Sequence, residues 1–178
     1  MEIIFTTPRL SARKWTIEEA QELHDIYSDP EVTRYLGVAK GVDRSIEKTT
    51  QRLEQILERD MKTPGLGFWC LQANDDGRIL GSVLLKQLDD RDEVEVGYHL
   101  RHEEWGNGYA TEAARGAVKH GVEVIGLPRI AAVSFAENIA SINVIRKLGF
   151  QYGGSQIVYG YDLEYYFANE LPVECMEV

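Results

Sequence analysis

The order of apolar and polar residues predicts a strand and three helices in the first part of the chain. Residues 9–15 alternate as a short strand does, and residues 16–27 begin with capping-box spacing and continue with a helical apolar face. Residues 29–37 open with an Asp-Pro pair and end at a glycine, which predicts a short helix. A longer amphipathic helix is expected over residues 43–61.

The rest of the chain mixes strand and helix patterns. Residues 67–100 contain three strand-like runs joined by tight-turn sequences, which is typical of an antiparallel meander. From residue 108 the apolar period becomes helical, and alanines form a narrow face that favours close packing on a sheet. A buried-type strand over 127–135, a helix over 138–149 and a terminal hairpin over 155–168 complete the pattern.

This order of elements predicts a single α/β or α+β domain over residues 6–170, followed by a short acidic tail over 171–178. We expect a central, mostly antiparallel sheet of about seven strands, flanked by about four to five helices. Aromatic residues gather in the terminal hairpin, and we interpret them as core and rim packing: Tyr159, Tyr161, Tyr165, Tyr166 and Phe167.

Composition and charge exclude several functions. A net charge of -10 argues against a nucleic-acid partner, because phosphate contacts need clustered Lys and Arg, whereas a cationic substrate would be attracted. Neither Cys70 nor Cys175 belongs to a ligand cluster, so we expect no disulfide framework and no metal. The sequence has no signal-peptide pattern and no apolar run of membrane-spanning length, so the expected location is cytoplasmic, without a membrane partner.

A glycine-rich loop precedes the alanine-rich helix. Gly106 and Gly108 lie just before Tyr109, where the first helical N–H groups lack internal partners and favour an anion. A nucleotide-hydrolysing P-loop would need a lysine that is missing, and a dinucleotide fingerprint would need glycine at Thr111. The loop by itself therefore indicates either a phosphate site or a plain tight turn.

The segment "WGNGYATEAARGAV" resembles motif A of the GNAT superfamily of N-acetyltransferases, whose pattern is Gln or Arg, any two residues, Gly, any residue, and then Gly or Ala. The resemblance extends over roughly residues 6–168, and "TPRL", "SDPEVTRYLG", "GYATEA" and "ENIASINVIRKLGF" are most similar to the branch of ribosomal-protein alanine and serine N-acetyltransferases. Trp105 departs from the pattern, because it stands where the superfamily favours Gln or Arg.

The resemblance implies a mixed sheet whose fourth and fifth predicted strands splay apart, with the pantetheine of acetyl-CoA lying between them. It implies direct acetyl transfer to a primary amine in a ternary complex. A bulge at Gly97 and a backbone oxyanion donor near Tyr98 or His99 are expected. The residues expected to bind the cosubstrate are His99, Leu100, Arg101, Gly106, Asn107, Gly108, Tyr109, Ala110, Thr111, Asn138 and Ser141.

The amine must lose a proton, so a carboxylate or imidazole base is expected. Glu95, two residues before Gly97, matches the strand-four glutamate of the superfamily and is the predicted catalytic base. Glu93 lies on the same face of the predicted strand, where a solvated glutamate is the simpler interpretation. His99 is the alternative base, although a lone histidine on a strand is more often structural.

The departing thiolate needs a proton. Many superfamily members use a tyrosine seven residues after the asparagine of the last helix, but that position is Ile145 here. The branch resembled offers a serine three residues after the asparagine, so Ser141 or a water is the expected acid. Asn138 is expected to cap this helix and to bind pantetheine.

The acceptor remains open between two classes. The resemblance favours the α-amine of a protein N-terminus, and a small cationic amine such as a polyamine or an aminoglycoside is the alternative. A non-catalytic acyl-CoA-binding regulatory module would keep the phosphate cradle without needing Glu95. A homodimer is possible. The expected walls of the acceptor pocket are Tyr35, Trp69 and Tyr98, with Trp15 as a further candidate.

Overall fold

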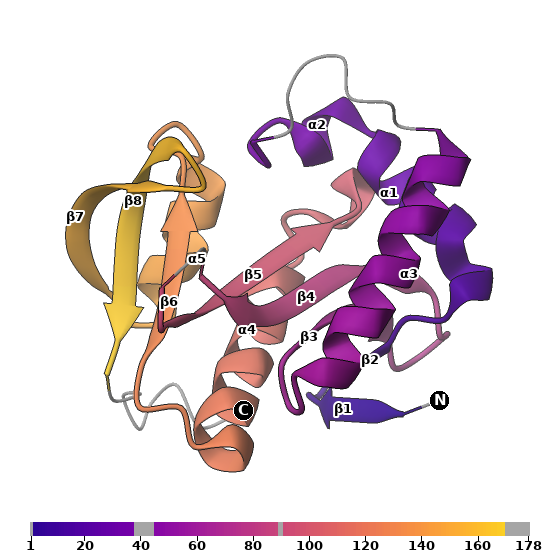
Figure 1. The fold of residues 1–178 in the computed structure, drawn as a ribbon, viewed down its shortest axis with the longest axis horizontal. Coiled ribbons are helices and arrows are strands. Elements are labelled where there is room, and N and C mark those ends of the chain that lie inside the picture. Colours follow the sequence, from indigo (N-terminus) through magenta and orange to yellow (C-terminus); the bar gives the residue numbers. More distant parts are fainter. Residues whose placement is uncertain (1, 38–44, 89–90, 170–178) are drawn as a thin grey trace.

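The computed structural model describes residues 2–37, 45–88 and 91–169. Its strands form an eight-stranded sheet in the order β1-β2-β3-β4-β5-β6-β8-β7 (Figure 1). All neighbouring strands are antiparallel except β5 and β6, which run parallel. The strands are β1 (Ile3–Thr6), β2 (Leu10–Lys14), β3 (Gly67–Ala73), β4 (Ile79–Gln87), β5 (Val94–Leu100), β6 (Ile130–Ser134), β7 (Gln151–Val158) and β8 (Tyr161–Ala168).

Helices cover both faces of this sheet. The helices α1 and α3 pack on one face, whereas α4 packs on the other against β4 and β5 (Figure 1). A π-helical turn, Gly121–Ile125, extends α4, and short 3-10 turns occur at Ile17–Glu19 and His102–Glu104. The α-helices are α1 (Ala20–Ser28), α2 (Pro30–Thr33), α3 (Ile46–Lys62), α4 (Tyr109–His120) and α5 (Ile139–Lys147).

The predicted fold class is confirmed, with one strand more than expected. The extra strand β1 pairs with β2 at the edge of the sheet. It is only four residues long, and its pairing depends on the neighbouring strand instead of on an alternation of its own. The expected acidic tail over 171–178 lies outside the described residues.

The expected splay occurs between β5 and β6. Their parallel register contains two pairs, Val94 with Ile130 and Glu95 with Ala131. Beyond these pairs β6 continues against β8, while β5 continues against β4. The two halves of the sheet therefore separate just after Glu95.

Small residues bring α4 close to the sheet. Ala113, Ala114 and Ala117 are completely buried, as the alanine face of the sequence predicts. Gly116 also contacts the N-terminal strand, since a Cβ atom there would lie 2.4 Å from the Phe5 ring. This close packing fixes the start of α4 beside the splayed strands.

Candidate active site

A cavity of about 1050 Å³ lies at the splay. One half is lined by α1, α2, α3, β4 and the β7–β8 hairpin, and the other by the glycine loop, the start of α4, and α5. Its two halves meet at β5, where Glu95 and Tyr98 both line the cavity.

The backbone of β5 turns alternate residues toward the gap. The N–H of Arg101 donates to the carbonyl of Leu80 at 2.9 Å, and the register with β4 is continuous along β5. In an antiparallel ladder the odd-numbered residues of β5 therefore bond to β4. The backbone groups of the even-numbered residues point the other way. The parallel pairing of Glu95 with Ala131 uses the Val96 N–H, and the Leu100 carbonyl accepts from the Trp105 indole. The groups that face the gap are the Val96 carbonyl, both backbone groups of Tyr98 and the Leu100 N–H.

Two expectations need correction here. His99 and Arg101 direct their backbone groups to β4, so of the expected segment 99–101 only Leu100 presents its backbone to the gap. The expected bulge at Gly97 is wrong as well, since Gly97 pairs with Leu84 in an unbroken register. The backbone N–H groups suited to an oxyanion are therefore those of Tyr98 and Leu100.

The glycine loop has the backbone geometry that an anion cradle requires. Gly106 and Gly108 have φ values of 81° and 80°, in the left-handed region that glycine adopts most easily. The N–H of Glu112 is the first to bond back into α4, to the carbonyl of Gly108, and no side chain caps the helix. The N–H groups of Tyr109, Ala110 and Thr111 are thus left for a ligand, and these residues line the cavity.

Arg9 holds this loop from behind. Its guanidinium donates to the carbonyl of Asn107 at 3.0 Å and to the carboxylate of Glu112 at 2.6 Å. The same carboxylate accepts from the Thr7 hydroxyl, and these bonds lower the pKa of Glu112 against the opposing effect of burial. The Asn107 carbonyl therefore stabilises the loop by accepting this hydrogen bond, and Asn107 does not line the cavity.

Trp105 also fastens the loop. Its indole N–H donates to the carbonyl of Leu100 at 3.0 Å, and its ring packs on His102. The residue that replaces the usual Gln or Arg thus ties the loop to the end of β5.

Glu95 is the buried carboxylate of the cavity. It is 6% exposed, and its Oε1 accepts from the Tyr159 hydroxyl at 2.5 Å and lies 3.1 Å from Lys86 Nζ. Glu93 does not line the cavity, because it bonds to Tyr165 and Arg129 outside it. Of the two glutamates, only Glu95 is placed for chemistry in the cavity.

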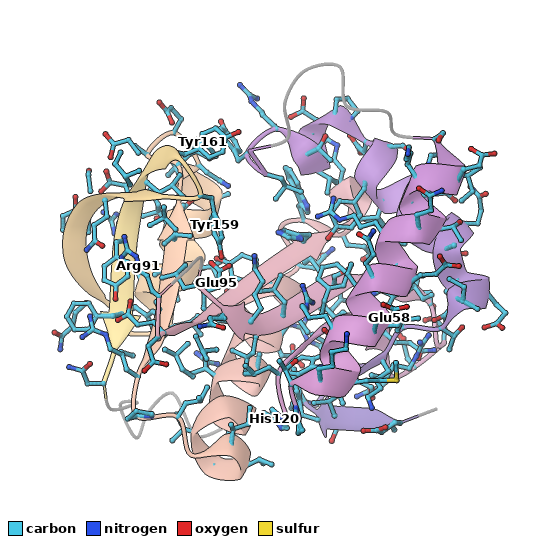
Figure 2. All side chains as sticks on the ribbon, in the orientation of Figure 1. Glu58, Arg91, Glu95, His120, Tyr159 and Tyr161 are labelled. Atoms are coloured by element: carbon cyan, nitrogen blue, oxygen red, sulfur yellow. The ribbon has the colours of Figure 1, made fainter. Side chains whose placement is uncertain are left out.

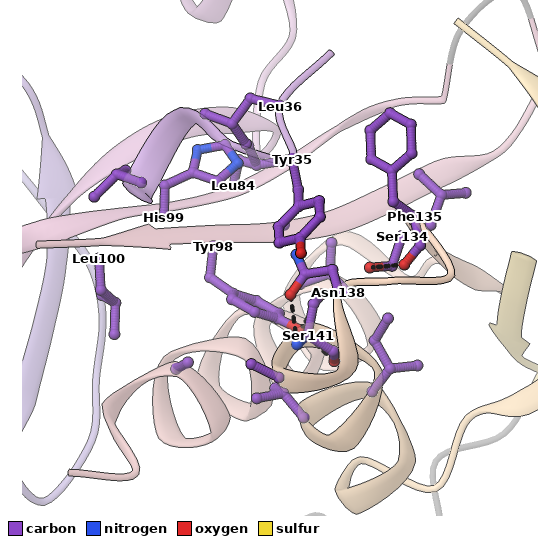
Figure 3. Close-up of a pocket in the computed structure, with 18 of the residues that line it drawn as sticks. Tyr35, Leu36, Leu84, Tyr98, His99, Leu100, Ser134, Phe135, Asn138 and Ser141 are labelled. Carbon is purple, nitrogen blue, oxygen red and sulfur yellow. Dashed lines mark hydrogen bonds between the residues drawn. The ribbon is translucent and has the colours of Figure 1, made fainter. Parts of the chain in front are cut away.

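His99 points to the face of β5 opposite Tyr98 (Figure 3). Its Nδ1 is 2.6 Å from the Tyr27 hydroxyl, and burial, followed by the charges of Arg52 and Lys86, lowers the pKa of His99 to about 4. An imidazole held neutral and already hydrogen-bonded is a weak base at neutral pH. This environment favours Glu95 over His99.

Ser141 lies at the start of α5 and lines the cavity. Its N–H donates to the side-chain oxygen of Asn138 at 3.2 Å, so Asn138 caps the helix (Figure 3). The Tyr98 hydroxyl contacts the Ser141 hydroxyl at 3.1 Å. Ile145, where many relatives of the resembled superfamily have tyrosine, is buried and apolar.

The expected acceptor walls divide into two groups. Tyr35 lines the cavity and points into it, and Tyr98 lines it from the α5 side (Figure 3). The prediction that Trp69 and Trp15 form walls of the pocket is wrong, since both are 2% exposed and belong to the hydrophobic core. Trp69 packs against Phe5 and His120, because its position on a strand covered on both faces leaves no open side.

Sequence reasoning missed three residues of the site. Tyr159 and Tyr161 line the cavity and are not mere packing, and Lys86 joins Tyr159 at Glu95. The signal for Tyr159 is its place before Gly160, in a two-residue hairpin turn that usually carries asparagine. Arg9 was visible only as part of "TPRL", with no indication that it reaches the glycine loop.

The part of the chain that the structure describes also bears on metal ligands, membrane spans and cysteines. There, His, Cys, Asp and Glu side chains form no group of three or more that could hold a metal ion, and no helix is both long and apolar enough to cross a membrane. Cys70 is buried, and burial raises the pKa of its thiol to about 12. Cys175 lies outside the described residues.

The fold is that of an acyl-transferring enzyme, and its splayed strands open onto a cavity. The sequence profile of the acetyltransferase (GNAT) domain matches residues 9–151. The chain therefore belongs to the GNAT family and is an N-acetyltransferase, with acetyl-CoA as the cosubstrate. YoaA, an uncharacterized N-acetyltransferase of Bacillus subtilis strain 168, is 32% identical over 152 residues, covering 85% of this chain and 84% of YoaA.

Solved structures share the fold. RimL, a ribosomal L7/L12 α-N-protein acetyltransferase in complex with coenzyme A, has a TM-score of 0.80 at 17% identity, covering 94% of this chain and 98% of RimL. MccE, the microcin C7 self-immunity acetyltransferase in complex with acetyl-CoA and AMP, has a TM-score of 0.76 at 17% identity, covering 92% and 94%. These two neighbours act in different settings, so the shared fold does not define the acceptor.

Proposed function

We propose that this enzyme transfers the acetyl group of acetyl-CoA directly to the α-amine of a peptide or protein N-terminus, with Glu95 as the base. The observation that carries the proposal is the position of Glu95. Its carboxylate is buried in the cavity at the point where β5 and β6 separate. It lies on the same strand as the backbone groups that face the gap.

In this proposal, residues on the two sides of β5 have different roles: one side binds the donor, and the other deprotonates the acceptor amine. The free N–H groups at the start of α4 suit the pyrophosphate of the donor, and the even-numbered residues of β5 suit its pantetheine amides and the carbonyl oxygen of the thioester. Glu95 takes a proton from the amine, directly or through water. The amine nitrogen bonds to the acetyl carbon, the carbon–sulfur bond breaks, and Ser141 or water protonates the thiolate.

The charge of the cavity supports an acceptor with a single amine. The chain has a net charge of -10, yet the described residues lining the half formed by α1, α2, α3, β4 and the hairpin carry more positive than negative side chains. These charged residues are Arg34, Arg52, Arg59 and Lys86 against Glu31 and Glu95. Arg34, Arg59 and Lys86 lie within ion-pair distance of Glu31, Asp60 and Glu95, so Arg52 carries the excess positive charge. This charge disfavours a polyamine or an aminoglycoside more than a peptide with one α-amine.

A thiol-detection assay tests the proposal. Purified enzyme with acetyl-CoA is offered short peptides with different N-terminal residues, spermidine, and an aminoglycoside, and products are identified by mass spectrometry. We expect peptides to raise thiol release and to gain one acetyl group at the α-amine. Turnover of spermidine but not of any peptide would refute the acceptor assignment, and CoA binding without turnover of any amine would favour a non-catalytic module.

A further inference from the structure

Tyr159 reaches the proposed base from a distant part of the chain. It lies at the tip of the β7–β8 hairpin, and its hydroxyl donates to Glu95 Oε1 on β5 at 2.5 Å. Figure 2 shows the two labelled side chains meeting between the hairpin and β5. Lys86 Nζ lies 3.1 Å from the same oxygen and 4.5 Å from the centre of the Tyr159 ring.

The backbone at Tyr159 is unusual. Its φ is 54°, the one positive φ of a non-glycine residue among the described residues, and Gly160 follows at 77°. Two positive φ values between Val158 and Tyr161, which pair with each other, define a type I′ turn, in which asparagine is preferred at the first position. A tyrosine there costs about 1–2 kcal/mol, so the hairpin gains nothing from this side chain as a turn former.

The two oxygens of Glu95 have unequal surroundings. Tyr159 and Lys86 both contact Oε1, whereas no side chain among the described residues forms a hydrogen bond with Oε2. A carboxylate held at one oxygen by a hydrogen bond and an ion pair has a fixed orientation. The other oxygen then remains for a ligand in the cavity.

A second tyrosine keeps the hairpin tip in place. The Tyr161 hydroxyl donates to the carbonyl of Gly37, beyond α2, at 2.6 Å, and its ring contacts Phe135 after β6. The hairpin is therefore tied to the opposite wall of the cavity. This connection gives Tyr159 a defined position over β5.

We propose that Tyr159 is a positioning residue for Glu95: its hydroxyl anchors Oε1, together with Lys86, so that Oε2 faces the acceptor amine. The inference rests on the proposed role of Glu95 as base. It explains why the turn carries a tyrosine in a conformation that other residues adopt more easily. The proton of the amine goes to Oε2 or to a water bound there, and Tyr159 keeps its own proton.

Kinetics of two substitutions test the positioning role. Tyr159→Phe removes only the hydroxyl, and Tyr159→Asn removes the phenol while suiting the left-handed backbone. Both should lower kcat/KM about tenfold, and the acid limb of the pH profile should move to higher pH, because a donor to the carboxylate is lost. Tyr159→Asn should unfold at the same or a higher temperature than the wild type. Tyr152→Phe, an exposed tyrosine on β7 outside the cavity, is the control.

A purely structural role of Tyr159 predicts that its replacement leaves catalysis unaffected. Tyr159→Asn would then keep full activity and an unchanged pH profile, which would overturn the proposal.

A second measurement needs no acceptor. In a double-mutant cycle of Tyr159→Phe and Glu95→Ala, the effects on the unfolding equilibrium constant should deviate from multiplicative behaviour by about tenfold, as a hydrogen bond to a carboxylate implies. Multiplicative effects would show that the two side chains do not interact, which refutes the positioning role whatever the acceptor is. Coupling in this cycle combined with no turnover of any amine would instead refute the proposed function alone.

Discussion

The Tyr98 hydroxyl lies 3.0 Å from the carbonyl oxygen of Ser141 and 3.1 Å from its hydroxyl, so a side chain of β5 bridges to the first turn of α5. Burial raises the pKa of Tyr98 to about 12, so the phenol keeps its proton at neutral pH. This bridge lies on the face of β5 opposite His99 (Figure 3).

Ser141→Ala should lower kcat roughly tenfold if Ser141 protonates the leaving thiolate. The loss is modest because the thiol has a pKa near 8.5 and needs little help from an acid. Steady-state kinetics with a peptide acceptor measure it. Ser155→Ala, which removes an exposed hydroxyl bonded to Glu164 on the terminal hairpin, is the matched control. An unchanged kcat would assign the proton to water.

Glu95→Gln should lower kcat/KM about a hundredfold and move the optimum of the pH profile upward. The amide cannot accept the proton, so more of the amine must be neutral before it binds. The affinity for CoA, measured by calorimetry, should stay within about twofold, because Glu95 faces the other half of the cavity. A wild-type profile would place the base elsewhere.

Gly108→Val should weaken CoA binding at least tenfold. A β-branched residue is disfavoured at φ of 80°, and its side chain would crowd the start of α4. Gly126→Val is the matched control, since Gly126 has φ of 78° and open space around it but does not line the cavity. Both variants should lose comparable stability, and calorimetry should show weakened binding for Gly108→Val alone. Equal affinities would rule out the cradle.

Arg9→Met should weaken CoA binding several-fold. The guanidinium bridges the carbonyl of Asn107 and the carboxylate of Glu112, so its loss should loosen the loop on which the free N–H groups depend. Lys14→Met breaks an exposed ion pair with Glu2 nearby and should leave the affinity unchanged. Equal binding by both variants would show that the loop holds its shape without Arg9.

His99 should make stability depend on pH. Its pKa in the folded protein is about 4, below its ordinary value of 6.5, so the unfolded chain binds the proton first as the pH falls. The stability that the folded protein gains from keeping this imidazole neutral is fully present above pH 6.5 and is lost as the pH falls to 4. Between pH 7 and pH 5, the free energy of unfolding measured with urea should fall by about 2 kcal/mol more for the wild type than for His99→Gln. Parallel losses would contradict the buried neutral imidazole.

The local sequence was sufficient for most elements. The Asp-Pro start of α2, the small-residue face of α4 and the asparagine cap of α5 are each confirmed, because they depend on interactions within a few residues. The short edge strand β1 was missed, because its pairing with β2 is a property of the sheet. Trp69 was misplaced because an aromatic residue on a strand gives no sign of whether a helix covers it.

The sequence by itself determined the family and the glycine loop, and it supplied Glu95 as the predicted base, since these depend on residue types at fixed spacing. Only the tertiary structure decided what surrounds them. Tyr159 lies 64 residues from Glu95 along the chain, and Arg9 lies 103 residues from Glu112. The direction of each backbone group of β5 depends likewise on its register with β4. Contacts of this kind arise when separate elements pack together, and no local pattern of residues encodes them.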